Sequence, residues 1–102
     1  ASLTNKPRTL AGNLLDLNLV RYGNFMWVRC SNYTKSAMNS GVTYTINQFG
    51  ENPILGVNRR YILNSAADFV IDISTNGTVK ITATAAVPKD TAINFSEFVL
   101  VS

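Results

Sequence analysis

The stretch that most constrains this fold runs from Leu15 to Cys30, LDLNLVRYGNFMWVRC. Two runs rich in large apolar residues flank Gly23-Asn24, an arrangement typical of a β-hairpin closed by a two-residue turn with positive φ. Taking Gly23-Asn24 as the loop fixes the register of the hairpin. The facing pairs are then Tyr22 with Phe25, Arg21 with Met26, Val20 with Trp27, Leu19 with Val28, and Leu17 with Cys30.

Because strand side chains alternate between two faces, this register divides the hairpin into two surfaces. The first surface is apolar except for Arg21, and we expect it to face the core. It carries Leu17, Leu19, Met26, Val28 and Cys30. The second surface is aromatic and amphipathic, edged by Asn18 and Arg29. It carries Val20, Tyr22, Phe25 and Trp27, and what covers it is the main functional question.

A second hairpin is indicated by Asp68–Ile73 and Thr78–Thr84. A two-residue Asn76-Gly77 loop would place apolar residues opposite polar ones. A three-residue loop, Thr75-Asn76-Gly77 with Gly77 in the left-handed conformation, pairs like with like. The predicted pairs are Ile73 with Val79, Ile71 with Ile81, Phe69 with Ala83, and Asp72 with Lys80.

The remaining chain supplies further short strands and no helix of three turns. We predict an edge strand near Arg8–Leu10, strands at 42–46 and Arg59–Leu63, and a closing strand over Ile93–Val101. In the closing strand the alternation shifts at Ser96-Glu97, which predicts a β-bulge that turns Phe98 and Leu100 inward. The loop 47–58, with Gly50, Pro53 and Gly56, is expected to pack its apolar residues on the body of the domain.

These elements predict an all-β fold, a small antiparallel sandwich or barrel of about six to eight strands. Residues 1–14 are read as a lead-in that joins residues 15–102, a single domain, to a stem on the N-terminal side. No apolar run reaches ~18 residues, so no membrane insertion is expected.

Composition argues against an enzyme. The 102 residues include no histidine and a single cysteine, so the commonest general base, the commonest metal ligand and any internal disulfide are missing. Asp68 and Asp72 share a strand face but lie about 13 Å apart along it, farther than the carboxylate pair of a glycosidase. We therefore expect no catalytic residues, no metal site and no cofactor, and read Cys30 as a small buried hydrophobe.

The polar residues favour a neutral partner. Nine basic and six acidic residues give a net charge of +3, but only Arg59 and Arg60 are adjacent, which is a weak signal for nucleic acid. Twelve Asn, ten Thr and eight Ser supply much uncharged hydrogen-bonding capacity. That capacity suits solvated strands and turns, and it also suits a polyhydroxyl ligand, which proteins bind with aromatic rings and a few polar groups.

Each candidate site residue also has a structural interpretation. Trp27 can instead be packed under a second sheet or at a subunit interface, and Asp72 can be half of an ion pair with Lys80. Arg59 and Arg60 can form a solvated strand edge, and Tyr61 a half-buried strand position.

The order of these elements resembles the C-terminal head domains of receptor-binding proteins of tailed phages, especially lactococcal phages. The hairpin at Leu17–Val28, LNLVRYGNFMWV, matches a strand ending in V-R-[FY]-G, and Phe69–Gly77, FVIDISTNG, matches F-x-I-D-I-x-x-x-G. The resemblance covers roughly Leu15 to Thr84. In those heads a His and an Asp two residues apart contact the sugar, with a Trp on the next strand. Only the aspartate carries over, as Asp72.

This resemblance implies a homotrimeric module of the virion, at the tail tip or baseplate, that binds host cell-wall polysaccharide outside the host cell and contacts other baseplate proteins. The predicted saccharide-binding residues are Asp72, Arg59, Arg60, Tyr61 and Trp27. Aromatic rings would stack on the sugar, Asp72 would accept hydrogen bonds from hydroxyls, and the arginines would meet any phosphate. Two alternatives remain: a structural baseplate or tail module whose aromatic face is a protein interface, and a barrel that binds single-stranded nucleic acid.

Overall fold

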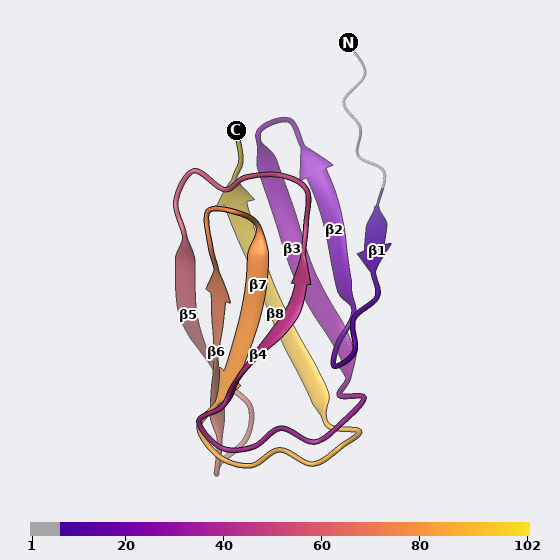
Figure 1. The fold of residues 1–102 in the computed structure, drawn as a ribbon, viewed down its shortest axis with the longest axis vertical. Coiled ribbons are helices and arrows are strands. Elements are labelled where there is room, and N and C mark those ends of the chain that lie inside the picture. The colour runs from indigo at the N-terminus through magenta and orange to yellow at the C-terminus, as the bar shows by residue number, and fades with distance from the viewer. Residues whose placement is uncertain (1–6) are drawn as a thin grey trace.

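The computed structural model describes residues 7–102, and within them it contains eight β-strands and no helix. The strands form two antiparallel sheets of four, in the orders β1-β2-β3-β8 and β4-β7-β6-β5 (Figure 1). Their bounds are β1 (Arg8–Leu10), β2 (Leu17–Tyr22), β3 (Phe25–Tyr33), β4 (Thr43–Gln48), β5 (Val57–Ile62), β6 (Asp68–Ile73), β7 (Thr78–Ala83) and β8 (Ala92–Leu100). The predicted all-β, antiparallel fold is confirmed.

The lead-in predicted at residues 1–14 is only partly covered. Residues 1–6 lie outside the described residues. Within the described part, β1 pairs with β2, in the register of Thr9 with Asn18, and Leu14 is buried. The edge strand expected at Arg8–Leu10 is therefore present.

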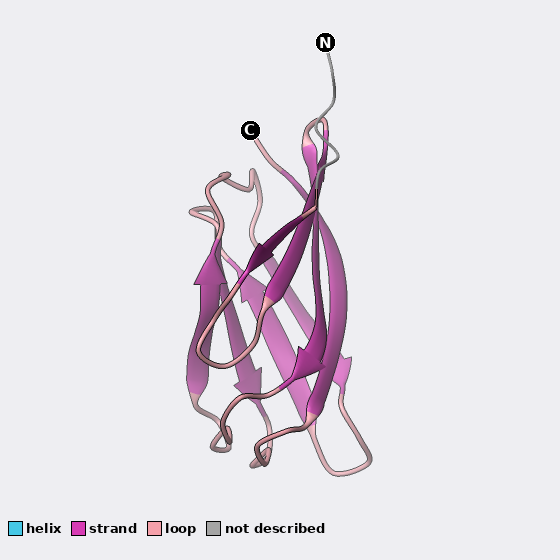
Figure 2. Ribbon diagram, turned by 90° about the vertical axis from the view of Figure 1, so that its right-hand side faces the viewer, coloured by secondary structure: helices cyan, strands magenta, loops and turns pink. Residues whose placement is uncertain are grey.

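The two sheets pack face to face, as the edge-on view in Figure 2 shows, and their inner faces form one core. The five apolar residues of the predicted core face of the first hairpin are each at most 1% exposed. Phe69 and Phe95, from opposite sheets, lie 6.3 Å apart at their ring centroids. The core therefore follows from the alternation of side chains along each strand.

Both predicted hairpin registers are confirmed. Across the first turn, Tyr22 pairs with Phe25 and Val20 with Trp27, while across the second, Ile73 pairs with Val79 and Asp72 with Lys80. Gly77 adopts a φ of 86°, in the left-handed region that the three-residue loop requires.

The chain crosses between the sheets at one end of the sandwich. The β3–β4 and β7–β8 connections run side by side there, at the foot of Figure 1, joined by an antiparallel bridge between Met38 and Val87. The hydroxyl of Thr34, which is fully buried, donates to the Pro88 carbonyl and accepts from the Thr91 amide. This junction satisfies backbone groups that burial would otherwise leave unpaired.

The bulge predicted at Ser96-Glu97 is wrong. β8 keeps an unbroken register with β3 from Ala92 to Leu100, so the alternation never shifts. Glu97 occupies an inward position, where the alternation along the strand would normally place an apolar residue, and it is 7% exposed. Phe98 and Leu100 consequently point outward and are 61% and 43% exposed.

Two smaller expectations also fail, and the described chain has a register shift that was not predicted, in β4 between Thr45 and Asn47. Val42, expected in that strand, precedes it and is exposed. In the β4–β5 loop Phe49 packs in the core as predicted, but Ile54 and Leu55 are exposed.

Candidate functional site: the outer face of the β1-β2-β3-β8 sheet

Six large apolar side chains lie on the outer face of the β1-β2-β3-β8 sheet, which no other part of the described chain covers as a layer. They come from neighbouring positions of β2, β3 and β8, and we call them the aromatic face: Val20, Tyr22, Phe25, Trp27, Phe98 and Leu100. Phe25, at 53%, and Phe98 are the most exposed of its rings. The surface predicted from the first hairpin therefore exists, and β8 enlarges it.

Trp27 lies at the centre of the aromatic face. Its ring is parallel to that of Phe98, with centroids 5.6 Å apart and planes 5° from one another. The Arg29 guanidinium carbon lies 5.0 Å from the Trp27 centroid, within cation–π range. The indole N–H donates to the Ser96 hydroxyl over 2.6 Å. These contacts fix the orientation of the ring on the surface.

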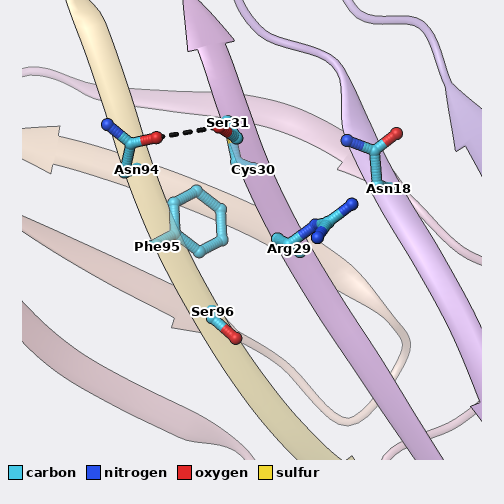
Figure 3. Close-up of a pocket in the computed structure, with 7 residues that line it drawn as sticks. All are labelled: Asn18, Arg29, Cys30, Ser31, Asn94, Phe95 and Ser96. Atoms are coloured by element: carbon cyan, nitrogen blue, oxygen red, sulfur yellow. Dashed lines mark hydrogen bonds between the residues drawn. The ribbon is translucent and has the colours of Figure 1, made fainter.

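A polar depression of about 530 Å³ lies on the same face, and two of its lining residues, Ser96 and Arg29, contact Trp27. Figure 3 shows the lining residues of the depression. Its rim comes from three adjacent strands. The polar lining residues are Asn18 on β2, Arg29 and Ser31 on β3, and Asn94 and Ser96 on β8. Cys30 and Phe95, whose side chains are buried, contribute to its floor.

The depression offers donors and acceptors without a carboxylate. Ser31 donates to the Asn94 amide oxygen over 2.9 Å, and the Thr9 hydroxyl donates to the Asn18 amide oxygen over 3.1 Å. Since both amide oxygens accept hydrogen bonds, both NH2 groups keep their donor capacity. Figure 3 shows the Asn18 nitrogen turned toward the Arg29 guanidinium, whereas the Asn94 nitrogen points away from Ser31. Such a set can donate hydrogen bonds to the hydroxyl or ring oxygens of a polyhydroxyl compound.

Two observations concern metal binding and the single cysteine. Among residues 7–102 no group of three or more His, Cys, Asp or Glu side chains is placed to hold a metal ion. Burial raises the pKa of the Cys30 thiol to about 11, so this thiol stays protonated and is a poor nucleophile.

Arg59 and Tyr61, two of the predicted site residues, lie at the seam where the edges of the two sheets meet. Both hold the inward carboxylate of Glu97: the Arg59 Nε lies 2.5 Å from Oε1, and the Tyr61 hydroxyl donates to the same oxygen over 2.7 Å. Desolvation first, and then the hydrogen bond to Glu97, raise the pKa of Tyr61 to about 12. The Tyr61 ring stacks on Phe69 at 5.3 Å. We call these three residues the Arg59–Tyr61–Glu97 seam.

Asp72 and Arg60 lie on the outer face of the other sheet. Asp72 faces Asn58 on one side and Lys80 on the other. The Arg60 Nε lies 3.8 Å from the Asp68 carboxylate, and 68% of the Arg60 side chain is exposed. Because the two sheets pack about 10 Å apart, Asp72 and Trp27 are separated by the whole thickness of the sandwich. The structure therefore divides the five predicted residues among three places: one on the aromatic face, two at the seam and two opposite.

Sequence reasoning missed Phe98, Ser96 and Asn94. Strict alternation through β8 would have placed all three on the outer face beside Trp27. The signal was obscured because Glu97 occupies a core position, and an acid there suggests a break in the pattern.

No protein-family model matches this chain, and no curated protein matches it in sequence. Within the described residues, no helix exists that could cross a membrane.

Proposed function

We propose that this chain is a non-catalytic saccharide-binding module, and that its sugar site is the polar depression bordered by Trp27. The observation that carries the proposal is the meeting of three amide or guanidinium side chains, Asn18, Arg29 and Asn94, with exposed aromatic rings on one face. Sugars present both hydroxyl groups and apolar C–H surfaces, so this combination matches their chemistry.

The setting of the proposal comes from the resemblance to phage receptor-binding heads. By this resemblance, the chain would be a homotrimeric module of a phage tail tip or baseplate that contacts other baseplate proteins. It would act outside the host cell and bind host cell-wall polysaccharide. The proposed site differs from the one carried over by that resemblance, since Asp72 lies on the opposite outer face. Asp72 therefore provides the comparison that tests the position of the site.

A second candidate function is a structural module whose aromatic face is a protein interface. It is favoured by the aliphatic end of that face, where Leu100 is 43% exposed and the Ile54 amide donates to the Leu100 carbonyl over 2.8 Å. Ile54, 53% exposed, extends the apolar surface beyond the sheet. Contiguous apolar patches of several hundred Å² are typical of contact surfaces.

Nucleic-acid binding is the least supported alternative. Five basic side chains of the described chain are paired with acids on separate elements: Arg8 and Arg21 with Glu51, Lys35 with Asp16, Arg59 with Glu97, and Arg60 with Asp68. A groove for a phosphate backbone requires cations gathered on one face. Binding to single-stranded DNA with an affinity that falls steeply as the salt concentration rises would support nucleic-acid binding.

The test of the proposed function is binding of the chain to purified lactococcal cell-wall polysaccharide by isothermal titration calorimetry. We expect Asn94→Ala and Trp27→Ala to weaken binding about tenfold or more, each corresponding to ~1.4 kcal/mol. Asp72→Ala should leave binding unchanged. The opposite result, loss with Asp72→Ala alone, would move the site to the other outer face. An oligomeric mass that falls with Trp27→Ala, in a chain that binds no polysaccharide, would favour the interface.

A further inference from the structure

The outward side chains of β3 and β8 form an ordered succession rather than a single pocket. Their register pairs Ser31 with Asn94, then Arg29 with Ser96, then Trp27 with Phe98, and finally Phe25 with Leu100. The first two pairs belong to the depression, and the last two belong to the aromatic face. Polar and aromatic surfaces therefore continue into one another along the strands.

The length of this succession is set by strand geometry. Ser31 and Phe25 are six residues apart on β3, which at ~3.3 Å per residue corresponds to about 20 Å. No bulge interrupts β3 or β8 over this length, since their register is constant. The surface is therefore a strip, longer than a single sugar and uninterrupted by a loop.

The strip is nearly free of charge. Arg29 is the one charged side chain among its four cross-strand pairs, and its guanidinium lies over the Trp27 ring. A nucleic acid or an acidic protein segment would find few cations here. A neutral chain that presents both hydroxyl groups and C–H surfaces can form hydrogen bonds with the polar half of the strip and apolar contacts with the aromatic half.

We propose that the ligand is an internal stretch of a linear, largely uncharged polysaccharide, lying along β3 and β8 across both halves of the strip. This inference rests on the proposed saccharide function and narrows it to a ligand class. Asn94, Ser31 and Arg29 hydrogen-bond one sugar unit, and Trp27 and Phe98 contact the C–H surfaces of the units that follow. A ligand confined to the depression would not contact Phe98, although Phe98 is the most exposed ring of the strip.

The experiment measures affinity against ligand length. Size-fractionated oligosaccharides released from a purified lactococcal cell-wall polysaccharide are titrated into the chain by calorimetry, with the oligomeric mass recorded by sedimentation. We expect affinity to rise about tenfold between the shortest and the longest fragments, as extra aromatic contacts form. Phe98→Thr should abolish that rise.

Val70→Thr is the matched control, because Val70 lies at a central outward position of β6 on the opposite sheet and faces Arg60 and Thr82. It should retain the full dependence on length. Equal affinity for short and long fragments would overturn the inference and leave the proposed function standing. Absence of binding at every length would overturn the proposed function itself. A Phe98→Thr variant that falls to monomer mass, with no dependence on length, would assign the strip to contact between copies.

Discussion

The two outer faces of this sandwich differ although the strands beneath them follow the same alternation. The outer face of the β4-β7-β6-β5 sheet carries a polar row across its strands, Asn58, Asp72, Lys80 and Thr45. On the outer face of the β1-β2-β3-β8 sheet, one row across the strands consists of Val20, Trp27 and Phe98. A sandwich needs only its inner faces to be apolar, so the apolar row on this outer face is not explained by folding.

This difference separates residues that hold the fold together from residues available to a partner. Arg59 and Tyr61 look like surface residues in the sequence but serve the joint between the sheets. Phe98 looks like a core residue but is open to solvent. The comparison therefore predicts large losses of stability for changes at the joints and small ones for changes on the aromatic face.

The largest expected effect comes from the turns of the two sheets. At Gly77 an added Cβ would lie 2.5 Å from the Phe49 carbonyl oxygen and 2.7 Å from that of Glu51, whereas at Gly23 it would meet nothing within 4 Å. Both glycines have positive φ. We expect Gly77→Ala to lower the free energy of unfolding by about 3 kcal/mol, through strain and steric overlap, and Gly23→Ala by about 1 kcal/mol, through strain alone. Urea denaturation measures both, and equal losses would contradict the difference.

The next effect contrasts adjacent arginines. Arg59→Ala leaves the buried Glu97 carboxylate with the Tyr61 hydroxyl alone, and we expect a loss of about 2 kcal/mol in unfolding free energy. Arg60→Ala removes an exposed contact with Asp68 and should cost less than ~0.5 kcal/mol. Denaturant titration of the two variants in parallel is the measurement. A larger loss for Arg60→Ala would show that the seam does not join the sheets.

The seam also gives an alkaline dependence of stability. The pKa of Tyr61 is about 12 in the folded chain and ~10 for an unperturbed tyrosine. As the pH rises from 10 to 12 the unfolded chain loses this proton first, so stability should fall over that interval. Tyr61→Phe removes this contribution and should flatten the fall, as followed by unfolding curves between pH 9 and 12. An unchanged slope in Tyr61→Phe would mean that the hydroxyl is not held by Glu97.

The smallest effect on stability is expected on the aromatic face. Because Phe98 is largely exposed, Phe98→Thr should change the free energy of unfolding by less than ~1 kcal/mol. It should nevertheless shorten retention on a hydrophobic-interaction column more than Val70→Thr does, since Val70 is flanked by Arg60 and Thr82. Similar retention of the two variants would show that the two outer faces do not differ in exposed apolar surface.

The parts of the fold that could be predicted from sequence were those specified locally. Gly23-Asn24 and Thr75-Asn76-Gly77 lie within a few residues of the strands they connect, so turn chemistry and alternation together determine both registers. The assignment of hairpins to sheets is different, because it depends on pairings between distant strands. Trp27 and Asp72 could therefore be identified as outward residues, while their separation by the full sandwich could not be read from the pattern.

Glu97 shows the same limit at a single position. Its partners, Arg59 and Tyr61, lie more than thirty residues earlier in the chain, and only they make a carboxylate tolerable in the core. Arg21 is a second case: it lies on the core face near the first turn, and Glu51 in the β4–β5 loop pairs with it and with Arg8. In both cases a polar residue at an inward position marks a long-range contact that a local pattern cannot reveal.

The pairing of β8 with β3 has a consequence for how the chain is made. β3 is complete at Tyr33, but its second neighbour is assembled only from residues 92–100. During synthesis from the N-terminus, the first hairpin is therefore made before the strands that cover it. The β3 edge that pairs with β8 stays unpaired, and the inner face of the hairpin stays uncovered, while the whole β4-β7-β6-β5 sheet is synthesised. Such distant pairing slows folding and exposes a free edge to other nascent chains. Completion of this sheet during synthesis therefore depends on β8, the last of the eight described strands to emerge from the ribosome.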